Sequence, residues 1–271
     1  MRFLGITRER VFSPGRVEDD AAILHGVAAA LRERGHDVDV FDADSEDWPR
    51  PGDDTLVFVM CQGARALAQL REWEQRGVRI VNAPEGILNC QRQRTIPLLQ
   101  EAGVGLPESI LVDAGAASPL PDWVSEAGAW LKRGDVHATE ADDVAYVTAP
   151  DVALEGLRRF KERGIARVVV QRHVAGVVLK FYAVRGSFFH CVSVAGALEV
   201  PREIRAGLGR VGQSAAARLG VEIYGGDCVY GKDGALSLID LNDWPSYRPC
   251  RASAAKAIAD YLEAQKVATR Q

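Results

Sequence analysis

Apolar and polar residues alternate along the first part of the chain in segments that predict strands and helices in turn. Short apolar runs with the length of buried strands occur at residues 2–7, 38–41, 55–60 and 78–81. Amphipathic segments at 18–34 and 64–76 have the spacing of helices, and a glycine follows each of them. Strands joined by helices in this way form parallel sheets, so residues 1–83 predict a small doubly wound, Rossmann-like lobe.

The remaining pattern predicts two further units that combine helices with short strands. In the second unit, residues 84–165, we expect strands at 109–112, 129–132 and 145–147 and helices at 92–102 and 151–163. In the third unit, residues 166–271, we expect strands at 168–171, 177–184 and 187–194, a hairpin over 226–242, and helices at 201–219 and 250–266. The predicted fold class is therefore α/β, with a Rossmann-like lobe followed by two α+β lobes.

Composition and charge narrow the classes of function. The chain has 271 residues, of which 47% are hydrophobic and 26% charged, an ordinary globular balance. A formal net charge of -4 gives no general reason to expect nucleic-acid or membrane binding. The five scattered cysteines lack metal-ligand spacing, which favours reduced thiols in a cytoplasmic protein and argues against zinc. We expect small-molecule substrates, no nucleic acid and no membrane; the oligomeric state stays open, a dimer included.

The predicted hairpin carries the most informative polar residues. A tight turn centred on residues 232–233 would place Tyr230 opposite Ala235, and Asp227 would then share a face with Asp240 and Asn242. Oxygen ligands of this kind suit Mg²⁺, which takes only one or two carboxylates when it binds beside nucleotide phosphates. The alternative is that the aspartates merely flank turns. We favour the metal, because Asp240 ends an apolar run in which an unpaired carboxylate would be costly.

Three polar residues interrupt other strand-like runs: Lys132, Gln171 and Lys180. A lysine within a strand can protect a sheet edge or extend its ammonium group to solvent, so each residue alone has a structural explanation. Together with the acidic hairpin, they suggest lysines for phosphate oxygens and carboxylates for Mg²⁺, as in phosphoryl transfer. The basic loop after the first strand, residues 8–16, lies where doubly wound sheets bind ligands, or is simply solvated.

The order of these motifs resembles that of the ATP-grasp superfamily over nearly the whole chain. The matching pieces are Asn82-Ala83-Pro84, Gln91-Arg92-Gln93-Arg94-Thr95, Trp130-Leu131-Lys132, Val169-Val170-Gln171, Gly226-Asp227 and the run from Ile239 to Pro245. The resemblance implies that ATP is held between the two α+β lobes, behind a pre-ATP-grasp Rossmann-like lobe.

The same resemblance implies roles for individual residues. Lys132 would bind the α- and β-phosphates, and Arg92 would take the place of a second phosphate-binding lysine. Gln171, His173 and Val174 would form the adenine-binding hinge. The metal, Mg²⁺ or Mn²⁺, would be held by Asp227, Asp240 and Asn242.

Two departures from the superfamily pattern point to one branch of it. Residues 133–140 lack the glycine-rich loop that many members have after the phosphate-binding lysine, and Asp240 replaces the usual glutamate. The spacing of His137 from Lys132, and the runs around Lys180 and Asp240, resemble inositol tris/tetrakisphosphate kinases. In those kinases the counterparts of His137 and Lys180 contact the phosphorylated substrate. Ser246 stands where that family has glycine.

Two enzyme functions and one binding function follow from these patterns. We favour a ligase that joins a carboxylate to an amine or thiol through an acyl phosphate, with His137 and Lys180 orienting the carboxylate. The alternative is a kinase of a small phosphorylated alcohol. A non-catalytic nucleotide-binding module is disfavoured because Lys132 and the acidic residues are retained. Four or more Arg and Lys side chains at the γ-phosphate end would favour a polyphosphate substrate, and one or two a carboxylate.

Overall fold

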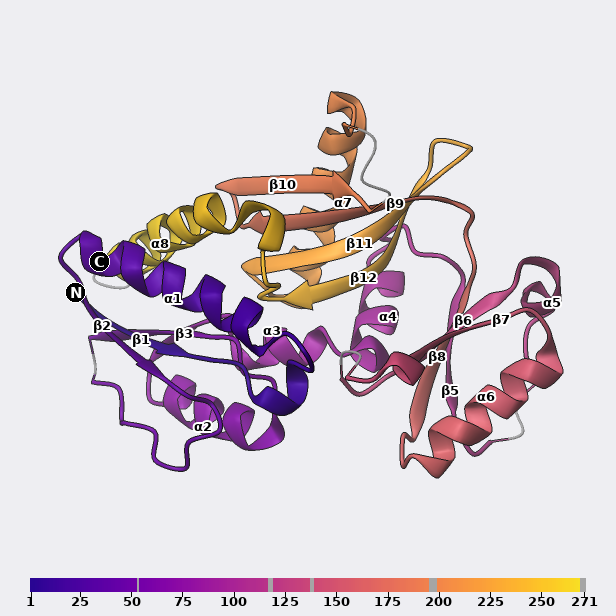
Figure 1. Ribbon diagram of the computed structural model, residues 1–271, viewed down its shortest axis with the longest axis horizontal. Helices are drawn as coiled ribbons and strands as arrows, with labels where there is room; N and C mark the ends of the chain where they lie inside the picture. Colours follow the sequence, from indigo (N-terminus) through magenta and orange to yellow (C-terminus); the bar gives the residue numbers. More distant parts are fainter. Residues whose placement is uncertain (53, 117–118, 137–138, 195–198, 269–271) are drawn as a thin grey trace.

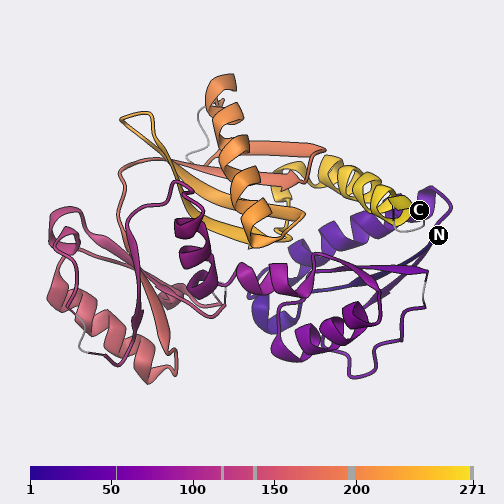
Figure 2. The ribbon, with the colours of Figure 1, turned by 180° about the vertical axis from the view of Figure 1, so that it is seen from behind.

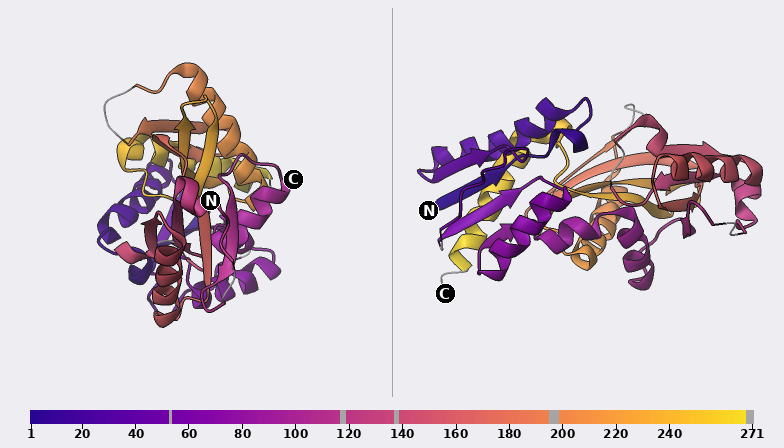
Figure 3. Two further views of the ribbon diagram at one scale, coloured as in Figure 1. Left: turned by 90° about the vertical axis from the view of Figure 1, so that its right-hand side faces the viewer. Right: turned by 90° about the horizontal axis from the view of Figure 1, so that it is seen from below.

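The computed structural model describes residues 1–52, 54–116, 119–136, 139–194 and 199–268. Its described residues form three four-stranded sheets that follow one another along an elongated molecule (Figure 1). The N-terminal lobe lies at one end, the central lobe at the other, and the C-terminal lobe between them. The N-terminus and the C-terminal helix, the last element that the structure describes, both lie at the N-terminal lobe (Figure 3).

The N-terminal lobe is a parallel sheet of order β2-β1-β3-β4, as the alternating pattern predicted. Its strands are β1 (Arg2–Ile6), β2 (Asp37–Phe41), β3 (Thr55–Val59) and β4 (Arg79–Val81). Helices α1 (Val17–Glu33) and α8 (Arg251–Ala268) pack together over the face that carries Phe3 and Phe58. Helix α2 (Ala64–Gln75) covers the opposite face. Because both faces are covered, the two central strands, β1 and β3, are almost continuously apolar.

The central lobe is an antiparallel sheet of order β5-β8-β6-β7. It comprises β5 (Ser109–Asp113), β6 (Ala129–Arg133), β7 (Val144–Val147) and β8 (Arg167–Arg172), with α5 (Trp123–Ala127) and α6 (Pro150–Glu162) on one face. We expected the strand at 168–171 in the third unit, and this was wrong. This strand is β8, and it belongs to the central lobe. It lies between β5 and β6 in the sheet and pairs with both of them.

The C-terminal lobe is an antiparallel sheet of order β10-β9-β11-β12. Its strands are β9 (Gly176–Val184), β10 (Phe188–Ser193), β11 (Ile223–Gly231) and β12 (Leu236–Asp243). Helix α7 (Arg202–Leu219) covers one face, and α4 (Arg92–Glu101) packs beside α7 and reaches towards the central lobe (Figure 2). The short helix α3 (Pro84–Asn89) leads into α4, and 3-10 turns occupy Arg10–Phe12, Ala141–Asp143 and Arg248–Cys250.

Buried hydrogen bonds join the N-terminal and C-terminal lobes. The side chain of Asn82, fully buried, accepts from the N–H groups of Glu222 and Ile223 and donates to the Ile223 carbonyl at 2.7 Å. Gln62 donates to Asp243 at 2.8 Å, also in a buried position. Buried polar groups are satisfied only if both lobes keep this arrangement, so these two lobes form one framework.

Candidate active site

The hairpin expected to carry the metal ligands is formed by β11 and β12, but its register differs from the expected one. The sequence predicted Tyr230 opposite Ala235, whereas the structure pairs Tyr230 with Leu236. The turn is therefore longer than a two-residue turn. On its own, this shift by one residue would place Asp227 and Asp240 on opposite faces of the sheet.

A β-bulge brings the two carboxylates back to the same face. Cys228 pairs with Leu238 and Asp227 with Asp240, so Ile239 is an extra residue on β12. The expected shared face of Asp227 and Asp240 is thus confirmed, although the register predicted for it was wrong. The bulge is what produces it.

Lys180, Asp227 and Asp240 form a row across three neighbouring strands. Asp227 lies directly opposite Lys180 on β9 and directly opposite Asp240 on β12. The Lys180 Nζ is 3.2 Å from Asp227 Oδ1, an ion pair without hydrogen-bond geometry. Burial raises the pKa of Asp227, the charge of Lys180 opposes this, and the charge of Asp240 adds to it. A further cation beside this row would be favourable.

Arg92 supplies the next charge along this face. It is the first residue of α4, and its Nη2 donates to Asp240 Oδ2 at 2.6 Å. Only 7% of the Arg92 side chain is exposed. A buried guanidinium requires such a carboxylate partner. If Arg92 binds a phosphate, as expected, its guanidinium would contact Asp240 and that phosphate at the same time.

Lys132 connects the central sheet to the hairpin. Its Nζ donates to Gln171 Oε1 at 2.8 Å and, across the space between the sheets, to the carbonyl of the bulged Ile239 at 2.9 Å. Burial lowers the pKa of Lys132 to about 8, while the negative charge of Asp240 opposes the shift. The residue expected at the phosphates is thus a buried ammonium group with a readily lost proton.

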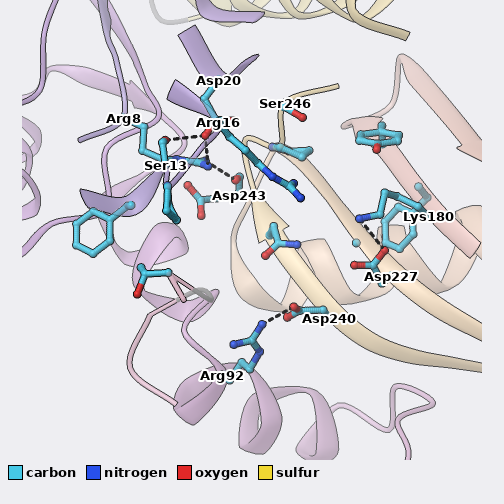
Figure 4. Close-up of a pocket in the computed structure, with 18 of the residues that line it drawn as sticks. Arg8, Ser13, Arg16, Asp20, Arg92, Lys180, Asp227, Asp240, Asp243 and Ser246 are labelled. Atoms are coloured by element: carbon cyan, nitrogen blue, oxygen red, sulfur yellow. Dashed lines mark hydrogen bonds and ion pairs between the residues drawn. The ribbon is translucent and has the colours of Figure 1, made fainter. Parts of the chain in front are cut away.

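Two cavities meet at Arg92 and Asp240. The smaller, of about 10 Å³, lies between the sheets of the central and C-terminal lobes and is lined by Lys132 and Gln171 as well. The larger, of about 450 Å³, opens towards the N-terminal lobe (Figure 4). We call it the acceptor cavity; besides Arg92 and Asp240, it is lined by Lys180, Asp227, Asn242 and the N-terminal loop at residues 12–16.

The N-terminal loop, which the sequence left undecided, lines the acceptor cavity. Arg8 donates to Asp20 Oδ2 at 3.1 Å and to the Trp244 carbonyl at 2.8 Å, so it links the loop to the end of β12. Ser13 donates to the same Asp20 oxygen at 2.7 Å. Arg16 extends into the cavity from the start of α1 (Figure 4). The available sequence signal was the position of this loop after the first strand.

Of the other predicted site residues, the structure describes His173 and Val174, which both follow β8. His137 lies outside the described residues. His173 follows β8, and its Nδ1 accepts a hydrogen bond from the Trp130 indole at 3.1 Å. Tyr146 packs against the same two rings. Val174 follows in the segment that joins β8 to β9, partly buried. The hinge proposed for adenine is therefore the chain crossing between the two sheets.

Asp143, a buried aspartate that was not among the predicted site residues, holds residues 139–140 after β6. Asp143, 0% exposed, accepts from the N–H groups of Thr139 at 2.7 Å and Glu140 at 3.1 Å. It also pairs with Arg133 at 3.2 Å and with Arg163. Thr139 and Glu140 line the acceptor cavity. Backbone hydrogen bonds to a carboxylate thus hold residues 139–140 at the edge of this cavity.

The donor set fits a divalent cation bound beside phosphates. Asp227 Oδ1 is buried without a hydrogen bond among the described residues, and Asn242 adds an amide oxygen to the same cavity. No group of three or more His, Cys, Asp or Glu side chains with metal-site geometry occurs in the described ranges. Two carboxylates and one amide are nevertheless enough when phosphate oxygens and water complete the shell.

No helix in the part of the chain that the structure describes is long and apolar enough to cross a membrane.

No protein-family model and no curated protein sequence matches the chain. Among solved structures, it is similar to D-alanine–D-alanine ligase from Bacillus anthracis complexed with ATP, at 14% identity and a TM-score of 0.73 over 100% of this chain and 98% of that one.

It is also similar to two further ATP-grasp structures. The ligase PsnB, complexed with a minimal precursor, Mg and ADP, matches at 20% identity and a TM-score of 0.66, over 97% of this chain and 98% of that one. A RimK domain ATP-grasp protein from Sphaerobacter thermophilus matches at 19% identity and a TM-score of 0.70, over 97% of this chain and 100% of that one. The chain therefore has the ATP-grasp fold of these ligases.

Proposed function

We propose that this protein is a Mg²⁺- and ATP-dependent ligase that joins a carboxylate to an amine or thiol. The observation that carries the proposal is that Arg92 and Asp240 line both cavities. Phosphates held by Lys132 and Arg92 would end where the acceptor cavity begins. The similar structures complexed with ATP, or with Mg and ADP, support this assignment of the nucleotide to the space between the sheets.

The reaction has two steps, and neither requires a nucleophilic side chain. A carboxylate oxygen of the acceptor attacks the γ-phosphorus, the bond to the β-phosphate oxygen breaks, and ADP leaves. The amine nitrogen then attacks the carbonyl carbon of the acyl phosphate, and phosphate leaves as the nitrogen loses a proton. Bound Mg²⁺, held by Asp227, Asp240 and Asn242, would neutralise phosphate charge. Lys132, Arg92 and Lys180 would align the reacting groups and stabilise the transferred charge.

The charges of the acceptor cavity favour a carboxylate over a polyphosphate. Four cationic side chains line it, a number that by itself would favour the kinase: Arg8, Arg16, Arg92 and Lys180. Three of these four are already paired, with Asp20, Asp240 and Asp227. Two more carboxylates, Glu140 and Asp243, line the same cavity. Among the described residues of this lining, Arg16 is then the one cation without an ion-pair partner, which matches the one or two cations expected for a carboxylate.

The kinase remains the second candidate because Lys180 lines the acceptor cavity beside Asp227, where a substrate phosphate could bind it. One assay separates the two functions. We expect ADP release that requires both a carboxylate and an amine, and a hydroxamate when hydroxylamine replaces the amine. The same assay with γ-³²P-labelled ATP would show label in free phosphate. Label kept on an alcohol such as an inositol phosphate would assign the kinase instead.

A further inference from the structure

We propose that Arg16 determines acceptor specificity by binding a second carboxylate, at the opposite end of the acceptor from the carboxylate that is activated. The inference rests on the proposed function and names its acceptor class. That class is dicarboxylic acids, including larger acids that carry a free carboxylate at their far end.

Arg16 is the cation of the acceptor cavity whose charge is not already used. Among the described residues, its guanidinium has neither an ion pair nor a side-chain hydrogen bond, whereas Arg8, Arg92 and Lys180 each have a carboxylate partner. Arg16 is also exposed, so it is hydrated and has paid no desolvation cost. A planar guanidinium in this position suits a carboxylate, which it can bind through two parallel hydrogen bonds.

The backbone of Arg16 is fixed although its side chain is exposed. Its N–H donates to the Ser13 carbonyl at 3.0 Å, and its carbonyl accepts from the Asp20 N–H at 3.0 Å. Ser13 and Asp20 are themselves buried and joined by a side-chain hydrogen bond. The residue that precedes α1 is therefore held in one place, which lowers the entropy cost of ordering its side chain around a ligand.

The charge of Arg16 acts inside the cavity. Burial raises the pKa of the Tyr182 phenol to about 12, the charges of Asp227 and Cys250 add to the rise, and the Arg16 guanidinium opposes it. Tyr182 lies on the pocket face of β9, two residues from Lys180, and lines the same cavity. Its hydroxyl makes no hydrogen bond within the described part of the chain and is a second donor for a carboxylate near Arg16.

The position of Arg16 separates its ligand from the reacting carboxylate. The reacting group must lie beside Lys180, Asp227 and Asp240, where the phosphates end. Arg16 enters from the opposite wall, which the N-terminal lobe provides (Figure 4). Phe12, Pro14 and Pro245 line the cavity as well and offer apolar contacts for a stem between the two ends. A cavity of about 450 Å³ accommodates an acid considerably larger than one carboxylate.

The test compares two probes of equal length, glutarate and glutaramate, in which one carboxylate is replaced by an amide. We expect wild-type protein to bind glutarate on the order of tenfold to a hundredfold more tightly in calorimetry, because a charged hydrogen-bonded pair is lost in the amide. Arg16→Ala should remove this preference, and Arg16→Lys should restore part of it. Arg10→Ala is the matched control, since Arg10 lies in the same loop but pairs with Asp42 at 3.6 Å, away from the cavity.

Equal binding of the two probes by wild-type protein would overturn the inference, and so would equal losses in Arg16→Ala and Arg10→Ala. Hydroxamate formation, measured on the same proteins, separates this result from the proposed function. Glutarate binding that depends on Arg16 but yields no hydroxamate would sink the ligase and leave the carboxylate site. Hydroxamate formation with the same half-saturating glutarate concentration in wild type and Arg16→Ala would leave the ligase and sink the specificity role.

Discussion

Two side chains of the candidate site carry charge in surroundings that disfavour it. Burial and Asp240 raise the pKa of Asp227, and burial lowers that of Lys132. In a folded protein such groups cost stability, and they persist where the charge serves a function. Replacing either group, or changing its protonation, should therefore change function without a matching loss of stability.

Asp227→Asn should reduce the rate of Mg²⁺-dependent ADP formation by about a hundredfold or more, without lowering the melting temperature at neutral pH. The folded-state pKa of Asp227 is raised, so stability is highest below the ordinary value of 3.8 and is lost as pH rises through the folded pKa. The amide avoids this loss. Thermal melts of both proteins from pH 3 to pH 8 measure it. A variant that melts well below wild type at pH 7 would contradict the prediction.

Lys132 should make nucleotide affinity depend on pH. A lysine with a pKa of about 8 is protonated below that value and neutral above it, so the free protein loses a phosphate-binding charge as pH rises through 8. We expect the Kd for Mg·ATP to increase between pH 7 and pH 9.5 in calorimetry. Lys132→Arg keeps its charge over this range and should bind without that dependence. A parallel increase in both proteins would refute the assignment.

At the scale of elements, the segment at residues 139–143, between β6 and β7, depends on one buried carboxylate. Burial alone would raise the pKa of Asp143, but the N–H groups of Thr139 and Glu140 and the guanidinium groups of Arg163 and Arg133 hold it well below its ordinary range. Removing one partner of a buried, hydrogen-bonded charge cluster costs about 3–5 kcal/mol. The position of residues 139–140 therefore depends on the charge of Asp143.

Asp143→Asn should lower the free energy of unfolding by about 3 kcal/mol at pH 7. The folded-state pKa is lowered, so this stabilisation is present above the ordinary value of 3.8 and is lost as pH falls towards the folded pKa. Urea titrations at pH 7 and pH 3 should show the difference between the two proteins shrinking at the lower pH. Asp142→Asn, an exposed neighbour, is the control and should match wild type. A constant difference at both pH values would exclude the charge network as the cause.

The sequence predicted elements better than it predicted their partners. Every expected strand is present, because apolar runs of strand length are a local signal. The helices α3 and α5 were missed; with 6 and 5 residues they are too short to show a helical period. The sheet that β8 joins is decided by pairing with β5 and β6, which are distant in sequence. Such pairings leave no local trace.

The candidate site shows the same division. Asp227, Asp240, Lys132 and Arg92 could be picked out because charges interrupt apolar segments or begin a helix in a recognisable order. The bulge at Ile239 could not, since an extra residue in a strand has no distinctive sequence. The loop that contains Arg16 was placed at a possible ligand site, but its sequence could not decide between a ligand-binding loop and a solvated one, because an arginine in a polar loop is ordinary until the fold shows what it faces. The pairing of β11 with β12 decides the first, and the position of the N-terminal lobe beside the C-terminal sheet decides the second.

At the scale of the whole molecule, the central lobe is joined to the rest more loosely than the other two lobes are to each other. The chain crosses to it at residues 106–108 and returns at 173–175. On the cleft side, Lys132 donates to Ile239 O at 2.9 Å, and the Gln93 N–H donates to Gly134 O at 2.9 Å. The N-terminal and C-terminal lobes instead share the buried contacts of Asn82 and Gln62.

Nucleotide binding should therefore move the central lobe and leave the other two together. The cavity between the sheets holds about 10 Å³, whereas ligand sites usually measure several hundred. The bridge from Lys132 to Ile239 O must open, with the two chain crossings as hinges. Hydrogen exchange with and without the Mg²⁺ complex of a non-hydrolysable ATP analogue should differ at 106–108, 173–175 and around Ile239. Exchange at residues 222–223, which bond to Asn82, should stay unchanged. Equal changes in both places would mean that all three lobes rearrange, and unchanged exchange at the hinges would mean that only side chains move.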